Sequence, residues 1–138
     1  NKELRMNESG LKRKYQILLA GDDQVNQDIV TAFLDGMPEL ELTIACDGRM
    51  ALEHSLAKKY DLLIFDQNMP YITGDRVLLH LRASRSLNAL TPAIWFTAVA
   101  DAKSAENKRV SGAAEVTLPK PLRRETFVST VKALLDLV

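Results

Sequence analysis

"DLLIF" (residues 61–65) is a nearly continuous apolar run that leads directly into a carboxylate, Asp66. A short unbroken run of this kind is typical of a strand buried on both faces, as in a parallel sheet that helices cover on each side. An acid at the end of such a strand is therefore the first candidate for chemistry in this chain.

The same pattern recurs along the chain, with longer amphipathic segments between the apolar runs. The other predicted strands are "QILLA" (16–20), "ELTIA" (41–45), "AIWFT" (93–97) and "AEVTL" (114–118). The predicted helices are residues 25–34, 50–57, 75–87, 101–111 and 123–137, of which 101–111 has the fewest apolar side chains to bury. Five strands alternating with five helices predict an α/β fold, a doubly wound parallel sheet with right-handed crossovers and helices on both faces.

Length and composition predict one domain without a strong overall charge. The chain has 138 residues, and 18 Lys+Arg balance 18 Asp+Glu to a formal net charge of zero. No global field therefore favours binding to nucleic acid or to an anionic membrane. Residues 1–14 are polar and charged, so we expect a tail or linker there and a domain at 15–138.

Cysteine content and hydropathy indicate the compartment. The single cysteine, Cys46, excludes an internal disulfide and a Cys-based zinc site, and it is predicted to be a small buried side chain. No apolar run reaches the roughly 18 residues that span a bilayer, and the N-terminus has no signal-like stretch. We expect a cytoplasmic protein.

Polar residues follow the predicted strands at the points where chemistry is expected. Asp22 and Asp23 follow the first strand, Asp66 follows the third, Thr97 ends the fourth and Lys120 follows the fifth. The carboxyl ends of parallel strands meet at one edge of a sheet, so these side chains should converge. Neighbouring carboxylates need a cation, and oxygen ligands favour Mg²⁺ or Mn²⁺. A lysine and a hydroxyl suit the oxygens of a phosphoryl group, for which an aspartate can be the nucleophile.

Three motifs resemble the receiver domains of two-component signalling. They are "LLIFDQNMPYITG" (62–74), "TPAIWFTA" (91–98) and "LPKPL" (118–122). The resemblance covers about residues 15–137 and implies the flavodoxin-like (βα)5 fold, with a five-stranded parallel sheet in the order 2-1-3-4-5. The run "VNQ" (25–27) is similar to receivers of hybrid sensor histidine kinases.

The resemblance also implies a role for each candidate residue. Asp66 would accept a phosphoryl group from a phosphohistidine and would ligate Mg²⁺, to which Asn68 would add its backbone carbonyl. Thr97 would bond a phosphoryl oxygen. Lys120 would pair with the carboxylate and then with the phosphate, and it would precede a cis bond to Pro121.

The turn after the first strand departs from the family pattern. Receivers normally carry a pair of acids there, and the register of the resemblance assigns Asp22 to the metal and places Gly21 where the first acid is expected. The loss of that carboxylate should weaken Mg²⁺ binding. For Asp23 two alternatives stand: it turns inward as a conditional metal ligand, or it caps the first helix.

Two further departures concern the response to phosphorylation. The family usually has an aromatic residue shortly before the lysine, and its change of rotamer follows the movement of the threonine. Here that position is Val116 or Thr117, and neither is aromatic, so this rotamer switch is in doubt. Many members carry a polar residue two positions after the threonine. Here it is Val99, which is expected to slow hydrolysis of the phosphoryl group.

The sequence therefore predicts a phosphoacceptor receiver domain and not an enzyme that turns over a diffusible substrate. Its expected partner is a sensor histidine kinase or a histidine phosphotransfer protein, without direct contact to nucleic acid or membrane. The resemblance also allows a dimer through the 4-5-5 face, formed by the fourth helix, fifth strand and fifth helix. Because the chain ends with its last predicted helix, we expect a stand-alone relay protein or, as we favour, a receiver from a hybrid kinase.

Two other functions are weighed against this prediction. A degenerate receiver would keep the fold and act as a phosphorylation-independent protein-binding module, and Gly21 and the missing aromatic favour it. A phosphatase of the haloacid dehalogenase type would need a second aspartate two residues after the nucleophile on the first strand. "GDDQ" (21–24) lacks that spacing.

Overall fold

The computed structural model describes residues 14–98 and 106–137. Its elements in chain order are β1 Tyr15–Ala20, α1 Gln24–Leu34, β2 Leu40–Ala45, α2 Gly48–Ala57, β3 Leu62–Asp66, α3 Gly74–Ala83, β4 Ala93–Thr97, β5 Glu106–Val110, β6 Ala113–Pro119 and α4 Arg124–Leu134. The five predicted strands are confirmed to within a residue at each end. The predicted tail, residues 1–13 with Lys14, lies almost wholly outside the described ranges.

The strands form one sheet in the order β2-β1-β3-β4-β6-β5. The first five of these run parallel, which confirms the predicted order 2-1-3-4-5 when β6 is counted as the fifth parallel strand. The order reverses between β1 and β3, so the carboxyl ends of these two strands flank the crevice where α/β sheets place their ligands.

The predicted helix at 101–111 is wrong over residues 106–110, which form β5. This strand runs antiparallel to β6, with Val110 paired to Ala113 across a two-residue turn. The turn residues Ser111 and Gly112 both have positive φ values, 50° and 90°. A tight turn of this kind suits the twist of two paired strands, so the Ser-Gly pair favours a hairpin over a helix. Residues 99–105 lie outside the described ranges.

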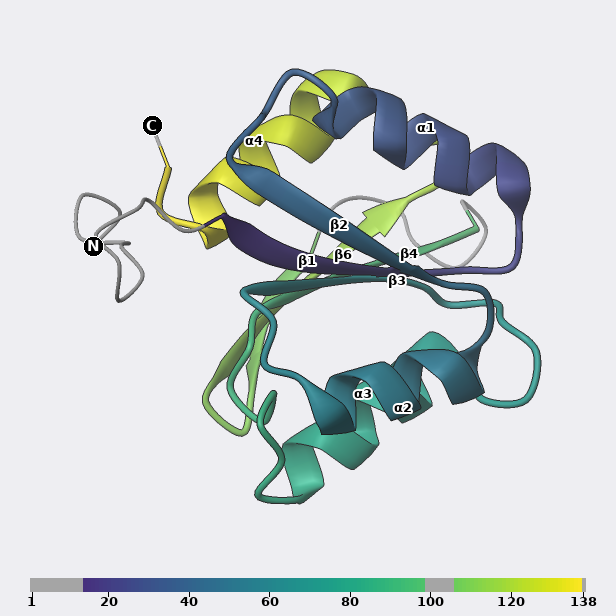
Figure 1. The fold of residues 1–138 in the computed structure, drawn as a ribbon, viewed down its shortest axis with the longest axis vertical. Coiled ribbons are helices and arrows are strands. Elements are labelled where there is room, and N and C mark those ends of the chain that lie inside the picture. The colour runs from purple at the N-terminus through teal and green to yellow at the C-terminus, as the bar shows by residue number, and fades with distance from the viewer. Residues whose placement is uncertain (1–13, 99–105, 138) are drawn as a thin grey trace.

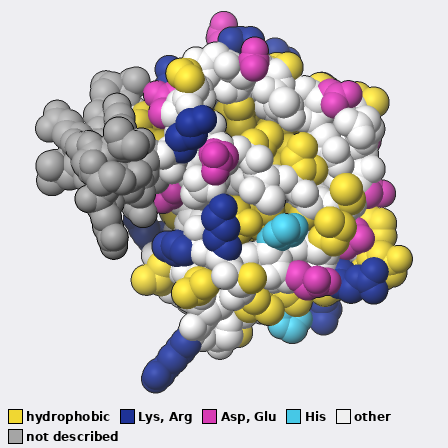
Figure 2. All heavy atoms as spheres, in the orientation of Figure 1, with side chains coloured by type: hydrophobic (Ala, Val, Ile, Leu, Met, Phe, Trp, Pro, Cys, Tyr) yellow, Lys and Arg dark blue, Asp and Glu magenta, His cyan; other side chains and the backbone are white. Residues whose placement is uncertain are grey.

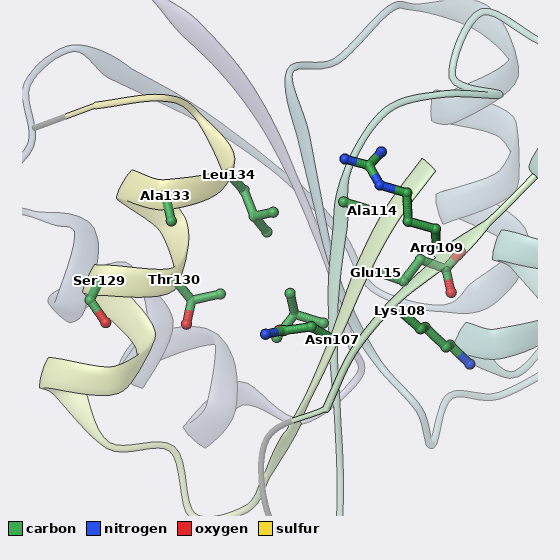
Figure 3. Close-up of a pocket in the computed structure, with 10 residues that line it drawn as sticks. Asn107, Lys108, Arg109, Ala114, Glu115, Ser129, Thr130, Ala133 and Leu134 are labelled. Carbon is green, nitrogen blue, oxygen red and sulfur yellow. The ribbon is translucent and has the colours of Figure 1, made fainter. Parts of the chain in front are cut away.

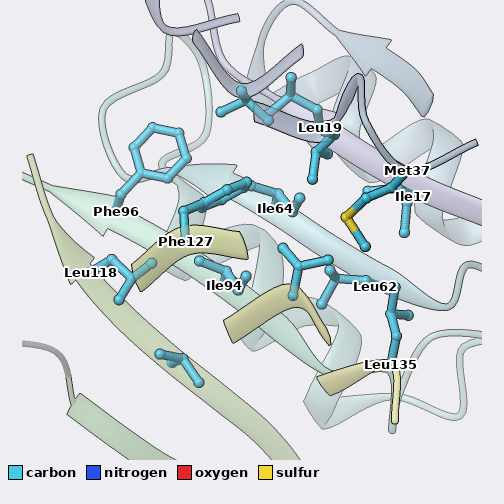
Figure 4. Close-up of a cluster of buried hydrophobic side chains, with 14 of the residues drawn as sticks. Ile17, Leu19, Met37, Leu62, Ile64, Ile94, Phe96, Leu118, Phe127 and Leu135 are labelled. Atoms are coloured by element: carbon cyan, nitrogen blue, oxygen red, sulfur yellow. The ribbon is translucent and has the colours of Figure 1, made fainter. Parts of the chain in front are cut away.

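Helices cover both faces of the sheet, with α1 and α4 on one face and α2 and α3 on the other (Figure 1). Alternate residues of the central strands fill the two resulting cores. Figure 4 shows the first core, to which Ile17, Ile64 and Phe127 of α4 all belong. Their neighbours Leu18 and Leu63 point to the second core, under α2 and α3. Burial on both faces explains the unbroken apolar runs of the sequence.

The burial of some side chains and the end of one helix differ from what the sequence predicts. Val25 begins the predicted apolar helix at 25–34, yet it is 64% exposed in the first turn of α1. Cys46 was predicted to be buried and is exposed in the connection after β2. The helix predicted at 75–87 ends at Ala83. Figure 2 shows charges of both signs interspersed over the face in view, as the zero net charge suggests.

Candidate active site

Asp66 ends β3 and is 2% exposed. Its carboxylate contacts Lys120 through both oxygens, with Lys120 Nζ at 2.9 Å from Oδ1 and 3.1 Å from Oδ2. The backbone N–H of Asn68 donates to Oδ1 at 3.1 Å. A carboxylate this deeply buried is tolerated only with a counter-charge and hydrogen bonds, and these contacts supply both.

Lys120 is held by the ends of two strands. Its backbone N–H donates to the Thr97 carbonyl at 2.8 Å, which ties the end of β6 to the end of β4. The Lys120–Pro121 bond is cis, as predicted. Thr97 is 4% exposed at the end of β4. The carboxyl ends of β3, β4 and β6 thus converge as the sequence predicts.

The turn between β1 and α1 places Gly21 against the central aspartate. A Cβ at Gly21 would lie 3.3 Å from the Asp66 Cβ and 3.8 Å from its Oδ2. The Gly21 carbonyl accepts a bond from the buried Gln27 side chain at 2.6 Å. Gln27 was not predicted as part of the site, although it belongs to the "VNQ" run. Its bond holds the turn that also carries Asp22, which is exposed.

Asp23 caps α1, which is one of its two predicted roles. Its Oδ1 accepts from the Val25 backbone N–H at 2.9 Å, and its Oδ2 accepts from the Asn26 side chain at 3.3 Å. Both carboxylate oxygens are therefore engaged at the helix start. The role of Asp23 as a metal ligand stays a prediction that these contacts do not favour.

The loop after Asp66 closes back onto the strand end because Gly74 has no side chain. A Cβ at Gly74 would lie 2.5 Å from the Asp66 carbonyl oxygen. The Gly74 N–H donates to the Gln67 carbonyl at 3.1 Å. On the other side of the loop, a Cβ at Gly48 would collide with the Ile72 backbone. Two glycines therefore allow the loop to pack against Asp66 and against the start of α2.

Asp75 stabilises this loop from the first turn of α3. Gln67 and Asp75 exchange two hydrogen bonds, of 2.9 and 3.0 Å, and the Thr73 hydroxyl donates to Asp75 Oδ1 at 2.7 Å. Burial raises the pKa of Asp75, but the hydrogen bonds from Thr73, Gln67 and the backbone outweigh it and lower that pKa below its usual value. The carboxylate form therefore helps to fix the loop.

The two candidate positions for the missing aromatic lie on opposite faces of β6. Val116 packs in the core under α1 and α4. Thr117 pairs in register with Trp95 of β4, so these two side chains lie side by side on the other face. The Lys108 ammonium lies 5.5 Å from the Trp95 ring centroid. Val99 lies outside the described residues.

The carboxylates alone do not form a complete metal site. Within residues 14–98 and 106–137, no group of three or more His, Cys, Asp or Glu side chains could hold a metal ion. The donors that the resemblance assigns to the metal, Asp22, Asp66 and the Asn68 carbonyl, are all oxygens, the ligand type that Mg²⁺ prefers. This ion keeps several waters and binds through one or two carboxylates together with phosphate oxygens.

Comparison with known proteins identifies the family of this arrangement. The family model for the response regulator receiver domain matches residues 17–132. The chain belongs to the receiver domain family of two-component systems.

No helix in the described part of the chain is long and apolar enough to cross a membrane.

Individual relatives of this receiver domain include kinases and regulators. It is 30% identical over 125 residues to the osmosensing histidine protein kinase SLN1 of Saccharomyces cerevisiae, covering 86% of the chain and 10% of that kinase. It is 29% identical over 122 residues to the transcriptional regulatory protein CutR of Streptomyces coelicolor, covering 86% of the chain and 52% of CutR. The chain thus spans about half or less of the length of these two relatives.

Solved structures share the fold. The receiver domain of sensor histidine kinase PA1611 from Pseudomonas aeruginosa, solved with magnesium in its active site cleft, has a TM-score of 0.73 at 23% identity, over 89% of this chain and 98% of that one. The chemotaxis protein CheY4 of Vibrio cholerae has a TM-score of 0.68 at 26% identity, over 88% of this chain and 99% of that one.

Proposed function

We propose that this receiver domain accepts a phosphoryl group on Asp66 from a phosphohistidine. The observation that carries the proposal is the buried Asp66 carboxylate, which Lys120 contacts through both oxygens at the convergence of three strand ends. In the transfer, a carboxylate oxygen of Asp66 forms the new bond to phosphorus. The bond between phosphorus and the histidine nitrogen breaks, and its electron pair stays on the imidazole.

The residues around Asp66 are suited to the charge that the transfer brings in. The Lys120 ammonium neutralises the carboxylate beforehand and can then pair with a phosphoryl oxygen, because it already lies 2.9 Å from Oδ1. The Thr97 hydroxyl, at the end of β4, would bond a second oxygen. Thr97 ends β4 and Lys120 directly follows β6, so the ends of two strands position both groups near Asp66.

Mg²⁺ is the cation that this site would take. Asp22, Asp66 and the Asn68 carbonyl would hold it, and a structural relative, the PA1611 receiver, binds magnesium in its active site cleft. When bound, the ion would neutralise charge on the phosphoryl oxygens. With Gly21 in place of an acid, we expect weak binding that depends on water ligands. Mn²⁺ could substitute, since it prefers the same oxygen donors.

The proposed partners are a sensor histidine kinase or a histidine phosphotransfer protein, as the likeness to a kinase such as SLN1 supports. Acting as a phosphoacceptor, the domain would turn over no diffusible substrate. Its place in a hybrid kinase and its cytoplasmic location belong to this proposal. Dimerisation through the 4-5-5 face stays a prediction, and on this chain that face would be built from β5, β6 and α4.

Phosphodonor chemistry tests the proposal directly. The protein is incubated with Mg²⁺ and acetyl phosphate, and intact mass spectrometry records addition of one phosphoryl group. Beryllofluoride binding is followed in parallel by the fluorescence of Trp95, the one tryptophan in the chain. We expect both signals in the wild type and in Asp35→Asn, an exposed control, and neither in Asp66→Asn.

The alternative of a degenerate receiver predicts the opposite outcome. It is favoured by the absence of a three-carboxylate group among the described residues. If neither probe modifies or binds the folded wild type at millimolar Mg²⁺, the phosphoacceptor function is wrong and a phosphorylation-independent binding module remains.

A further inference from the structure

Tyr71 occupies a strained turn in the connection from β3 to α3. Its φ is 71°, in the left-handed region that favours glycine. The Ile72 N–H donates to the Pro70 carbonyl at 2.9 Å, so Tyr71 is the centre of a γ-turn of the rarer form, which has a positive φ. The Tyr71 side chain is nevertheless 73% exposed. Burial in the core therefore does not explain a tyrosine here, and strained residues of this kind cluster at functional sites.

The start of α2 holds this turn in place. The Gly48 N–H donates to the Pro70 carbonyl at 3.2 Å, and a Cβ at Gly48 would collide with the Ile72 backbone. The Arg49 guanidinium carbon lies 4.6 Å from the centroid of the Tyr71 ring, close enough for a cation–π contact. Arg49 is exposed, and within the described ranges it forms no ion pair with a carboxylate. The Tyr71–Arg49 pair thus presents an aromatic ring and a positive charge side by side.

The Tyr71–Arg49 pair lies near the proposed phosphoacceptor. The same connection carries Asn68, whose N–H bonds the Asp66 carboxylate at 3.1 Å. Tyr71 follows Asn68 by three residues, so their Cα atoms are at most roughly 11 Å apart. A stable complex buries about 800 Å² on each partner, the area of a disc of roughly 16 Å radius. A protein that brings a phosphohistidine to Asp66 would therefore cover Tyr71 as well.

The chemistry of the pair suits a protein partner. Tyr and Arg are among the residue types most enriched at the hot spots of protein interfaces. The γ-turn and the contact with Arg49 order the Tyr71 ring beforehand, which lowers the entropy cost of association. The guanidinium can form charge-assisted hydrogen bonds to an acidic side chain. The pair can therefore contribute both affinity and a preference for charge.

The Tyr71–Arg49 pair is separate from the face built from β5, β6 and α4. Figure 3 shows the groove of about 640 Å³ on that face, which is lined in part by Asn107, Thr130 and Leu134 and by neither Tyr71 nor Arg49. A protein that contacts the pair while its phosphohistidine meets Asp66 therefore does not need to occupy that groove.

We propose that Tyr71 and Arg49 select the protein that phosphorylates Asp66. The Tyr71 ring packs against an apolar side chain beside the phosphohistidine of that protein, and Arg49 pairs with an acidic side chain at the edge of the same contact. Neither residue touches the phosphoryl group, so the two determine specificity and not the chemical step. The inference rests on the proposed phosphoacceptor function and adds the residues that recognise the phosphodonor.

Comparison of a protein phosphodonor with a small one tests the inference. The protein phosphodonor is a phosphorylated histidine phosphotransfer protein, chosen from a panel as the one that phosphorylates the wild type fastest, and the small one is acetyl phosphate. Mass spectrometry follows both reactions at saturating Mg²⁺. Tyr71→Gly removes the ring and suits the positive φ. For this variant the half-saturating concentration of the protein phosphodonor should rise roughly tenfold or more, with the maximal transfer rate and the acetyl phosphate reaction unchanged.

Further variants separate recognition from the structure of the turn. Tyr71→Phe keeps the ring and should react as the wild type does, whereas Arg49→Glu should weaken recognition through charge repulsion. The matched control is Arg109→Glu. Arg109 is exposed and pairs in register with Ala114 near the start of β6, at the opposite edge of the sheet from the carboxyl ends of the parallel strands. This control should leave both reactions unchanged, and Tyr71→Gly should unfold in urea as the wild type does.

Two results would overturn the inference while the proposed function stands. One is an unchanged half-saturating concentration for Tyr71→Gly, and the other is an equal loss with acetyl phosphate, which would assign Tyr71 to the chemical step. A wild type that acetyl phosphate modifies, but that no phosphotransfer protein of the panel modifies, would also refute it. If acetyl phosphate fails on the wild type, the phosphoacceptor function itself is wrong.

Discussion

Gly21 shapes the site at the scale of a single residue, because it lies against the Asp66 side chain. Without a side chain, position 21 adds no negative charge beside the acceptor carboxylate. Its carbonyl still serves the fold by accepting the bond from Gln27. A substitution at this position would change the charge of the pocket, with its Cβ in tight contact, 3.3 Å, with the Asp66 Cβ.

We predict that Gly21→Asp strengthens Mg²⁺ binding by roughly tenfold, because a further carboxylate beside Asp66 adds charge to an oxygen site. The same change should lower stability in EDTA through repulsion between carboxylates. Calorimetric Mg²⁺ titration and urea unfolding measure the two effects. Gly21→Ala is the control, since its Cβ would make the same 3.3 Å contact without the charge. Equal Mg²⁺ affinities for the Asp and Ala variants would refute the charge argument.

At the scale of elements, the connection from β3 to α3 acts as one unit. Gly74 closes it onto the Asp66 carbonyl, and the paired Gln67 and Asp75 side chains bridge its ends. The unit positions Asn68, whose N–H reaches the Asp66 carboxylate. A substitution at Gly74, or in the Gln67–Asp75 pair, should therefore alter the contacts of the Asp66 carboxylate.

Gly74→Ala should destabilise the fold by about 1–3 kcal/mol, the usual cost of forcing atoms into a packed site. The backbone must shift because the new Cβ would lie 2.5 Å from the Asp66 carbonyl oxygen. Gly36→Ala is the matched control, since nothing lies within 4 Å of a Cβ there. Chemical denaturation compares the two. A similar free energy of unfolding for both variants would contradict the close approach at Gly74.

The Asp75 carboxylate predicts a pH dependence of stability. Its pKa is lowered in the folded protein, so its contribution is present above its ordinary value of 3.8 and is lost as pH falls through the folded-state pKa. Asp75→Asn should therefore cost more stability at neutral pH than in strong acid. Urea unfolding across this pH range measures the difference, and Thr73→Val should reduce it. A cost that does not change with pH would refute the role of the charge.

The β5–β6 hairpin shows how local preference and tertiary pairing compete within one element. In the sequence, residues 101–111 lie between two predicted strands, 93–97 and 114–118. The alternation of strands and helices along the chain therefore favours a helix there. The Ser111–Gly112 turn was the available signal for a hairpin, because both residues take positive φ. The strand itself is stabilised by pairing with β6, a contact that helix periodicity does not report.

At the scale of the whole molecule, a buried ion pair joins the helical layer to the sheet. Arg82 of α3 contacts Glu115 of β6 at 2.9 Å, with side chains 1% and 6% exposed. Arg82 also donates to the Asn88 carbonyl at 2.9 Å, which ties in the connection from α3 to β4. The pair therefore couples β6 to α3 and to the connection that follows α3, with Arg82 and Glu115 33 residues apart in the chain.

Glu115→Ala should cost about 3–5 kcal/mol, because it leaves the Arg82 guanidinium buried without its counter-charge. Replacing both residues together, by Arg82→Met with Glu115→Leu, should cost less than the single change, since no charge then stays buried. Urea unfolding of the three proteins measures this. A double variant as unstable as the single variant would show that packing, and not charge, dominates the site.

The sequence alone determined the buried strands, their order through the family resemblance, and the residues at their carboxyl ends. It could do so because unbroken apolar runs are local patterns. Asp66, Thr97 and Lys120 are then identified by their positions at or just after the predicted strand ends. Only the tertiary structure decided that Asp23 caps α1, that Gly21 lies against Asp66, and that β5 forms an edge. Each of these depends on contacts between segments or on a choice among local hydrogen-bond partners, which periodicity and propensity do not encode.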